Sequence, residues 1–304
     1  MIDDPPNPPV AGQIQVIRED LICVLAPNSS PMTHWGTNSF LIGRERLVLI
    51  DPGPAIAAHR HALLAAIDGR PVSHILVTHS HLDHSPLAQA MSQETGASVY
   101  AFGCSSAGRS PIMAELASKT TLGGGEGVDH DFTPDVLLAD GAVIATETGP
   151  ITAHHTPGHM GNHLCFEWQD ALFSGDHVMG WSSSLISPPD GDLLDFMASC
   201  LKLQALGKTV YFPAHGGAIR TPNARVDWLV NHRKDREAGI VKALSSGPSS
   251  AADLARSIYA DLPAHLLPAA ERNVLAHLVA LAQAGRAMAD PELSPNAIFR
   301  LNER

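Results

Sequence analysis

The chain has 304 residues, enough for one large domain and one small one, and its residues are 44% hydrophobic and 17% charged. No stretch approaches the roughly eighteen consecutive apolar residues of a membrane span, so we expect no membrane segment. The net charge is −11. Residues 226–304 contain nine Lys or Arg and nine Asp or Glu residues, so the acidic excess lies in residues 1–225. Such an acidic body disfavours a general polyanion binder.

Residues 1–15 are predicted to form a flexible arm, because the chain starts with an acidic, proline-rich stretch. This stretch lacks the positive charge and the apolar run of a secretory signal. Cys23, Cys104, Cys165 and Cys200 form no C-x-x-C pair, and three of them lie in apolar runs. We therefore expect reduced cysteines in a cytoplasmic protein.

The first chemical motif follows residues 73–78, a β-branched run that predicts a buried strand. Four candidate metal ligands come directly after it: His79, His81, Asp83 and His84. Clustered imidazoles repel one another when protonated, and a metal ion removes this cost by binding their lone pairs. Ser85 and Pro86 predict the start of a helix that ends at Gly96. The cluster is thus predicted to lie at a sheet edge, where open α/β sheets bind ligands.

Three later segments each place a polar side chain after an apolar, strand-like run. These side chains are His159 after a Thr-Pro-Gly turn, Asp176 after residues 171–175, and His215 after residues 209–214. Imidazole and carboxylate ligands suit Zn, with Fe and Mn as alternatives. His154 and His155 precede the Thr-Pro-Gly turn, and we interpret them as packing or loop histidines rather than ligands.

The segments T-H-S-H-L-D-H, T-P-G-H, S-G-D and P-A-H-G, in this order, resemble the successive motifs of the metallo-β-lactamase superfamily. The upstream L-I-D-P-G segment resembles the first motif of that family. The resemblance implies an α/β fold, a four-layer αβ/βα sandwich with two divalent metals between the sheet edges. It also implies a ligand set: His79, His81 and His159 for one metal, Asp83, His84 and His215 for the other, and Asp176 as the bridge.

The same resemblance implies roles for further residues. Asp51 would orient the H-x-H-x-D-H loop. A hydroxide that bridges the metals would be the nucleophile, and Asp83 would take its proton after attack. His163 has two interpretations: a role beside the metals or the substrate, as in glyoxalase-II-like members, or a surface residue that opens the next strand. Trp181 and Ser182 are candidate substrate-binding residues, and a core position is the alternative for Trp181.

Two loops are candidates for setting specificity. Residues 104–135 contain the glycine-rich segment 123–127 and are predicted to be mobile, and residues 179–192 follow the bridging aspartate. Residues 16–222 are predicted to form the catalytic domain.

The C-terminal residues 223–304 have a helical pattern. Helices are expected from Asn223 to Leu244, over about residues 251–259 after a serine cap, and over about residues 263–285; a short strand follows. This order resembles the winged-helix domain appended to lactamase-beta-2-like hydrolases, and the H-R-x-x-R segment fits that branch. The basic run 232–236 contains an acid, and we interpret it as a solvated helix face. A packing or lid role for this domain is therefore favoured over contact with nucleic acid.

Three functions follow as hypotheses. The first is a dinuclear metal hydrolase of a small acyl ester or thioester, as in glyoxalase-II-like enzymes; an aspartate at position 176, where the commonest zinc β-lactamases have cysteine, supports it. The second is a single-strand-specific endoribonuclease of the lactamase-beta-2-like type, and the third is a non-enzymatic, metal-sensing winged-helix regulator. A small-molecule partner is favoured over nucleic acid, and the sequence leaves homo-oligomerisation open.

Overall fold

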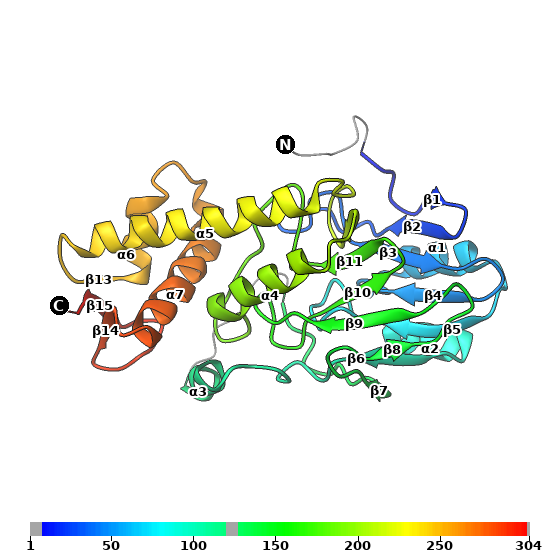
Figure 1. Cartoon of the computed structure of the whole chain (residues 1–304), viewed down its shortest axis with the longest axis horizontal. Helices are drawn as coiled ribbons and strands as arrows, with labels where there is room; N and C mark the ends of the chain where they lie inside the picture. Colours follow the sequence, from blue (N-terminus) through cyan, green and yellow to red (C-terminus); the bar gives the residue numbers. More distant parts are fainter. Residues whose placement is uncertain (1–7, 120–126, 303–304) are drawn as a thin grey trace.

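The computed structural model describes residues 8–119 and 127–302. The start of the predicted N-terminal arm and the glycine-rich segment up to residue 126 lie outside the described residues. Two β-sheets pack face to face, and helices cover the outer face of each sheet (Figure 1). Most strands of these two sheets contain β-branched or aromatic residues beside leucine, as is typical of buried strands.

The first sheet has seven strands, whose spatial order follows the chain: β1 (Ile14–Arg18), β2 (Leu21–Leu25), β3 (Asn38–Ile42), β4 (Leu47–Ile50), β5 (Val72–Leu76), β6 (Ser98–Ala101) and β7 (Val136–Leu137). Strands β1 to β4 are antiparallel, and β4 to β7 are parallel. The strand expected at residues 73–78 is confirmed as β5.

The second sheet has five strands, in the spatial order β12 (Val210–Pro213), β11 (Ala171–Gly175), β10 (Leu164–Trp168), β9 (Ile151–His155) and β8 (Val143–Ile144). Strands β11 and β12 are parallel, and the other neighbours are antiparallel. Strands β9, β11 and β12 therefore point the same way, and their carboxyl ends lie at one edge. The strands expected before the later motifs are thus confirmed.

Three hydrophobic cores separate the four layers. Between the sheets, buried side chains such as Phe40, Phe166 and Phe212 interdigitate. Helices α1 (Ala57–Ile67) and α2 (Ala88–Thr95) pack on the outer face of the first sheet. Helices α4 (Leu193–Ala205) and α5 (Pro222–Leu244) pack on the outer face of the second sheet. The four-layer αβ/βα sandwich predicted from the sequence is confirmed.

Helix α2 begins at Ala88, two residues after Pro86, the first helical residue that the Ser-Pro pair predicts. The Ser85 hydroxyl donates instead to Asp129 Oδ2 (2.7 Å), which lies on a distant loop, so it does not cap the helix. The predicted end is confirmed: Gly96 is the C-cap and has a φ of 74°.

The C-terminal part contains three further helical segments and a small sheet: α6 (Ala251–Ile258), the 3-10 helix η1 (Ala264–Leu266), α7 (Leu267–Gln283), and strands β13 (Ser249–Ser250), β14 (Ala287–Asp290) and β15 (Ile298–Leu301). The predicted serine cap is confirmed, because the Ser250 side chain accepts from Asp253 N at 3.1 Å. Strands β13 and β15 were not predicted. Both strands are short and lack a strong alternation of apolar and polar residues. They are recognised only by their backbone pairing, β15 lying between β13 and β14.

Helix α5 connects the two parts of the molecule (Figure 1). Its first half packs on the second sheet through Val226 and Leu229, and its last turns enter the C-terminal core through Ile240 and Leu244. Helix α3 (Pro111–Lys119), from the loop 104–135, also packs into the C-terminal core. The domain boundary at residues 222 and 223 stays a prediction. Among the described residues, no helix is both long enough and apolar enough to span a bilayer.

Candidate metal centre

The predicted ligands follow the carboxyl ends of strands and meet at one edge of the sandwich. The loop 78–84 follows β5, and Asp51 follows β4 beside it. His159 follows β9 through a tight turn, Asp176 follows β11 directly, and His215 comes just after β12. Because these strand ends lie at the same edge, the fold brings all seven predicted ligands into one buried region.

Four buried side chains form the first ligand cluster, and their ligand atoms lie within 4.8 Å of one another: His79, His81, His159 and Asp176. His81 Nδ1 lies 2.9 Å from His79 Nε2 and 3.1 Å from His159 Nε2. Imidazole nitrogens at this distance repel through their lone pairs unless a proton or a cation lies between them. The geometry therefore suits a cation held by nitrogen ligands.

Asp83, His84 and His215 form the second cluster, and all three are buried. Asp83 Oδ2 lies 3.3 Å from His84 Nε2 and 3.2 Å from His215 Nε2. Thr37 Oγ1 also lies 3.4 Å from this carboxylate oxygen. The second cluster thus has one carboxylate and two imidazoles around a common point, a ligand set that divalent transition metals accept.

Asp176 faces both clusters with its two carboxylate oxygens. Its Oδ2 lies 3.5 Å from His159 Nε2 in the first cluster. Its Oδ1 lies 3.3 Å from His215 Nε2 and 3.6 Å from His84 Nε2 in the second. A carboxylate in this position can bind one cation through each oxygen, so the two clusters have the arrangement of a binuclear site.

Hydrogen bonds at Nδ1 hold four of the imidazoles so that Nε2 points into the site. The bonded pairs are His79 with Thr78 Oγ1 (3.0 Å), His84 with Asp51 Oδ2 (3.0 Å), His159 with Leu185 O (2.7 Å) and His215 with Gly36 O (3.0 Å). Since a carbonyl or carboxylate only accepts, Nδ1 carries a proton in the last three, and Nε2 is the nitrogen that can offer its lone pair to a metal once it is itself unprotonated.

Several buried polar atoms in the site have no hydrogen-bond partner among the described residues: Asp83 Oδ1, His84 Nε2 and Asp176 Oδ1. An unsatisfied buried atom of this kind costs free energy, and more so when it is charged. Bound cations would satisfy all three atoms at once. The donor set and these orphaned atoms therefore fit two divalent metal ions.

The two clusters differ in their protonation. Burial and the neighbouring imidazole of His159 lower the pKa of His81 to about 3, and burial also lowers the pKa of His79 well below its ordinary value. In the second cluster, burial acts the same way, but the carboxylates outweigh it: Asp176 and Asp83 raise the pKa of His215 to about 10. A cation would thus bind neutral imidazoles in the first cluster and displace protons from the second.

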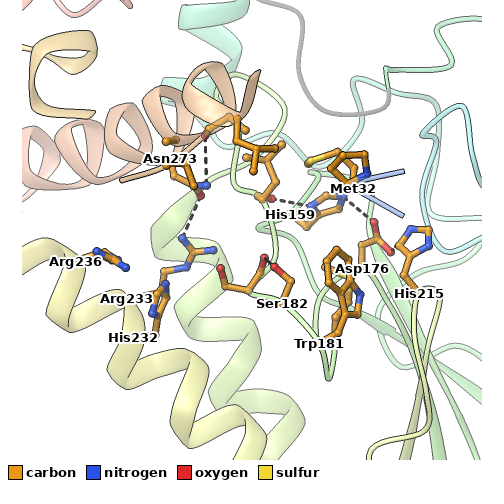
Figure 2. Close-up of a pocket in the computed structure, with 18 of the residues that line it drawn as sticks. Met32, His159, Asp176, Trp181, Ser182, His215, His232, Arg233, Arg236 and Asn273 are labelled. Atoms are coloured by element: carbon orange, nitrogen blue, oxygen red, sulfur yellow. Dashed lines mark hydrogen bonds and ion pairs between the residues drawn. The ribbon is translucent and has the colours of Figure 1, made fainter. Parts of the chain in front are cut away.

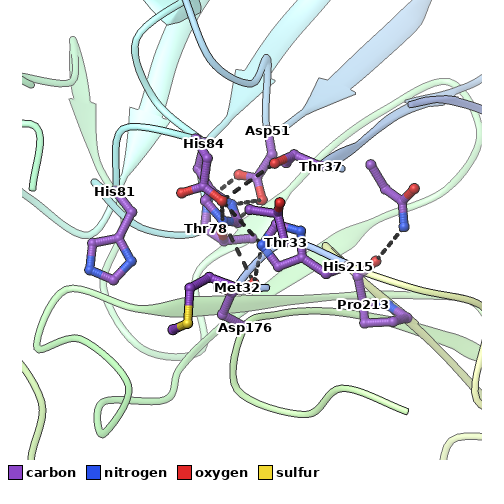
Figure 3. A network of polar contacts seen from close by, with 12 residues as sticks. Met32, Thr33, Thr37, Asp51, Thr78, His81, His84, Asp176, Pro213 and His215 are labelled. Atoms are coloured by element: carbon purple, nitrogen blue, oxygen red, sulfur yellow. Dashed lines mark hydrogen bonds and ion pairs between the residues drawn. The ribbon is translucent and has the colours of Figure 1, made fainter. Parts of the chain in front are cut away.

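Asp51 organises the loop without pointing at the ligand atoms of the clusters (Figure 3). It has a φ of 49°, in the left-handed region that aspartate tolerates better than most residues. Its Oδ1 accepts from Thr78 N (2.7 Å), and its Oδ2 accepts from Thr78 Oγ1 (2.7 Å) and from His84 Nδ1 (3.0 Å). This matches the orienting role that the resemblance implies for it.

His163 is fully buried, so the interpretation as a surface residue is wrong. Its Nε2 accepts from the backbone N–H of Asp176 (3.2 Å), and its Nδ1 lies 2.9 Å from Thr156 Oγ1. Burial lowers its pKa well below the ordinary value, which keeps Nε2 available as an acceptor. His163 therefore holds the backbone of Asp176 and is not part of either ligand cluster.

His154 and His155 lie outside both ligand clusters, as predicted. His154 Nε2 lies 2.7 Å from Glu167 Oε2. The His155 ring stacks on Phe102, with 3.7 Å between the ring centroids.

A cavity of about 340 Å³ opens above the ligands (Figure 2). Trp181 and Ser182 line it, as expected for substrate-binding residues, and Trp181 stacks on His34 with 4.7 Å between the centroids. The opposite wall comes from the C-terminal part and was missed by the sequence analysis: His232, Arg233, Arg236, Tyr259, Leu262, Leu266, Ala269, Ala270 and Asn273. The H-R-x-x-R segment was the one sequence motif that could have indicated this wall.

The interpretation of residues 232–236 as a solvated helix face is wrong for three of its members. Arg233 is only 3% exposed, and His232 and Arg236 are half-buried; all three line the cavity. The reason is tertiary: α6 and α7 cover the side of α5 on which these residues lie, while Lys234 and Asp235 stay exposed.

Comparisons with known proteins agree with this geometry. Residues 32–215 match the family described as "Metallo-beta-lactamase superfamily", and residues 250–292 match the "Beta-lactamase associated winged helix domain". The chain is 29% identical over 283 residues to a beta-lactamase-like protein 2 homolog from Drosophila melanogaster, which covers 89% of this chain and 90% of that protein. It is also 29% identical over 277 residues to an atrochrysone carboxyl ACP thioesterase from Aspergillus fumigatus, covering 84% and 78%.

Among solved structures, a beta-lactamase domain protein from Burkholderia ambifaria has the same fold. It superimposes with a TM-score of 0.79 at 21% identity and covers 98% of this chain and 97% of that one. The match therefore includes the C-terminal part as well as the sandwich. The family match covers more than half of the chain and contains all the predicted ligands. The chain thus belongs to the metallo-beta-lactamase superfamily, as a metal-dependent hydrolase with a C-terminal beta-lactamase-associated winged-helix domain.

Proposed function

We propose that the protein is a dinuclear hydrolase of small acyl thioesters or esters. The observation that carries this proposal is the position of Asp176, which presents one carboxylate oxygen to each of two buried ligand clusters. A site for one metal would not need this arrangement. The similarity to an ACP thioesterase supports a thioester as the substrate class.

The proposed ligands are those of the two clusters. His79, His81 and His159 would hold one ion, Asp83, His84 and His215 the other, and Asp176 both. Zn is the metal that we propose, and Fe and Mn accept the same ligands. When bound, such ions supply Lewis acidity, which polarises a carbonyl and makes water a nucleophile at neutral pH.

Asp83 is the proposed proton acceptor. Burial alone would raise its pKa, but His84 and His215 outweigh this and hold the pKa of the carboxyl below its ordinary value. Asp83 is therefore ionised at neutral pH. The residue lines the cavity and has two carboxylate oxygens, so the oxygen that does not bind the ion could take a proton from a reacting group there.

The cavity fits a small substrate with an apolar part. Its walls near the ligands contain Met32, Met179, Leu185 and Trp181, and Ser182 adds a hydroxyl. We propose that these side chains hold the acyl group and exclude water from it. A volume of about 340 Å³ lies at the lower end of the range for small-molecule sites.

The endoribonuclease hypothesis keeps one supporting observation, because two arginines line the cavity and could contact phosphate. The neutral charge of residues 226–304 counts against an extended RNA track. A non-enzymatic regulator does not fit the hydrolase relatives.

The test compares two substrates on protein of measured metal content: an acyl thioester of N-acetylcysteamine and a single-stranded RNA oligomer. The blank is the double variant His81→Ala/Asp83→Ala, and the matched control is His130→Ala/Asp131→Ala, in which both residues are exposed. Thioester cleavage that survives in the control and disappears in the blank supports the proposal. RNA cleavage with this pattern, without thioester cleavage, contradicts it.

A further inference from the structure

The wall of the cavity opposite the metal ligands is positively charged. Arg233 and Arg236 lie on α5 at one side of the cavity, and His159, Asp176 and His215 lie at the other (Figure 2). This wall belongs to a chain whose net charge is −11, so the positive charge is local.

Arg233 is buried, and no carboxylate forms an ion pair with it in the described part of the chain. Its Nη1 donates to Asn273 Oδ1 (3.1 Å), its Nη2 donates to Ser184 O, and its guanidinium lies 5.4 Å from the centroid of Phe196. These partners are neutral, and its Nε has no partner among the described residues. A buried charge without a counterion is costly, and an anion in the cavity would offset that cost.

Arg236 lies one helical turn further along α5 and lines the same cavity. Its guanidinium lies over the ring of Tyr259, 4.8 Å from the centroid. No hydrogen bond or ion pair engages its side chain within residues 8–119 and 127–302. The nearby Glu237 pairs with Arg286 instead, so it does not neutralise this wall.

Arg225 adds a third guanidinium beneath the loop 179–192. It donates to Met179 O and Ser182 O, both at 2.6 Å, and so also has only neutral partners among the described residues. It holds in place the loop that carries Trp181. No carboxylate forms an ion pair with any of the three arginines among the described residues, and two of them, Arg233 and Arg236, line the cavity itself.

We propose that Arg236, with Arg233 behind it, binds an anionic group of the substrate, a carboxylate or a phosphate, so that the protein hydrolyses anionic acyl thioesters. The guanidinium presents donors in a planar fork that matches either anion. The apolar side chains of the cavity lie between the arginines and the candidate metal ligands. They would cover the part of the substrate that joins the anion to the scissile carbonyl. This inference rests on the proposed hydrolysis of thioesters and names the substrate class for it.

The test uses two matched substrate pairs with metal-loaded protein. Glutaryl and pentanoyl thioesters of N-acetylcysteamine place the anion on the acyl side, and the acetyl thioesters of 4′-phosphopantetheine and pantetheine place it on the thiol side. We expect kcat/KM to be at least about tenfold higher for the anionic member of one pair, the factor that about 1.4 kcal/mol of binding gives. Which pair shows this preference identifies the source of the anion.

Three variants assign the preference to one side chain. Arg236→Gln should lower kcat/KM for the anionic thioesters at least about tenfold more than for the neutral ones, which is the whole of the preference. Arg236→Lys should restore part of the preference, and Lys234→Gln, an exposed neighbour on the same helix, should leave it intact. If the ratio of kcat/KM for the anionic thioester to that for the neutral one is the same in the wild type and in Arg236→Gln, the inference is overturned, while the proposed thioester hydrolysis is unaffected.

A binding measurement separates this inference from the proposed function. Glutarate and 4′-phosphopantetheine are titrated into metal-depleted protein by NMR, where hydrolysis plays no part. Weaker binding of either probe to Arg236→Gln than to Lys234→Gln supports the anion site even if no thioester is cleaved. Equal binding to the two variants, or displacement by a single-stranded oligonucleotide with a steep salt dependence, contradicts it.

Discussion

Asp51 acts at the metal centre through hydrogen bonds alone. Its two carboxylate oxygens accept three hydrogen bonds, two from Thr78 and one from His84. The bond to His84 fixes which ring nitrogen carries the proton, and the bonds to Thr78 fix where the ligand loop starts. An amide in place of the carboxylate has one accepting oxygen and one donating nitrogen, so it cannot accept all three bonds.

We therefore expect Asp51→Asn to weaken metal binding by about 10- to 100-fold, the usual effect of losing a partner of a metal ligand. Competition with a chromophoric chelator measures this affinity. Asp261→Asn, an exposed aspartate in the C-terminal part, is the control. Unchanged affinity in Asp51→Asn would show that the loop holds its shape without this carboxylate.

At the scale of elements, each ligand stands after a strand and close to a tight turn. The turn before His159 passes directly over the first residues of α4. Gly158 has a φ of 140°, and a Cβ at this position would lie 2.3 Å from Phe196 Cα. Backbone atoms cannot yield as a flexible side chain can, so only glycine fits here.

We expect Gly158→Ala to lower the free energy of unfolding by about 2–4 kcal/mol, because strain and a backbone clash act together. Gly149→Ala is the matched control, since Gly149 also has a positive φ (102°) but no atom within 4 Å of an added Cβ. Strain alone should cost about 1 kcal/mol there. Urea unfolding of both variants measures the difference, and equal losses would mean that the turn can move away from α4.

At the scale of the whole molecule, the metal centre joins elements that are far apart in the chain. Four of the seven ligands follow the first sheet and three follow the second. Among the described residues, two backbone hydrogen bonds, from Leu164 N to Thr78 O and from Asn38 N to Ala214 O (both 2.7 Å), also link the two sheets at this edge. Bound ions would therefore tie the sheets together in the folded state.

Removal of metal should lower the melting temperature substantially. A ligand at 1,000 times its Kd adds about 4 kcal/mol for each site, and 1 kcal/mol shifts the melting temperature of a domain this size by about 2–4 °C. We expect a loss of at least about 8 °C after treatment with a chelator, recovered on adding zinc, by calorimetry. The variant His81→Ala/Asp83→Ala should show a smaller loss, and an equally large one would place the metal elsewhere.

From the sequence alone came the candidate ligands and, through the resemblance of their motifs to a known family, the layered fold. Metal ligation needs particular side chains at short spacings, and strands have a period of two, so both leave local signals such as the H-x-H-x-D-H segment. The same holds for the serine cap of α6 and the glycine that ends α2, because caps are interactions over a few residues.

Only the tertiary structure decided what depends on distant partners. The Ser85 hydroxyl binds Asp129 and not the helix, His163 is buried and binds the backbone of Asp176, and Arg233 lies in the cavity wall. In each case the local pattern permits two outcomes of similar free energy, and the residue that selects one of them is more than ten positions away. The cavity wall opposite the candidate ligands also depends on distant partners. Helices α5 and α7 contribute to it, and their packing against the sandwich places them there.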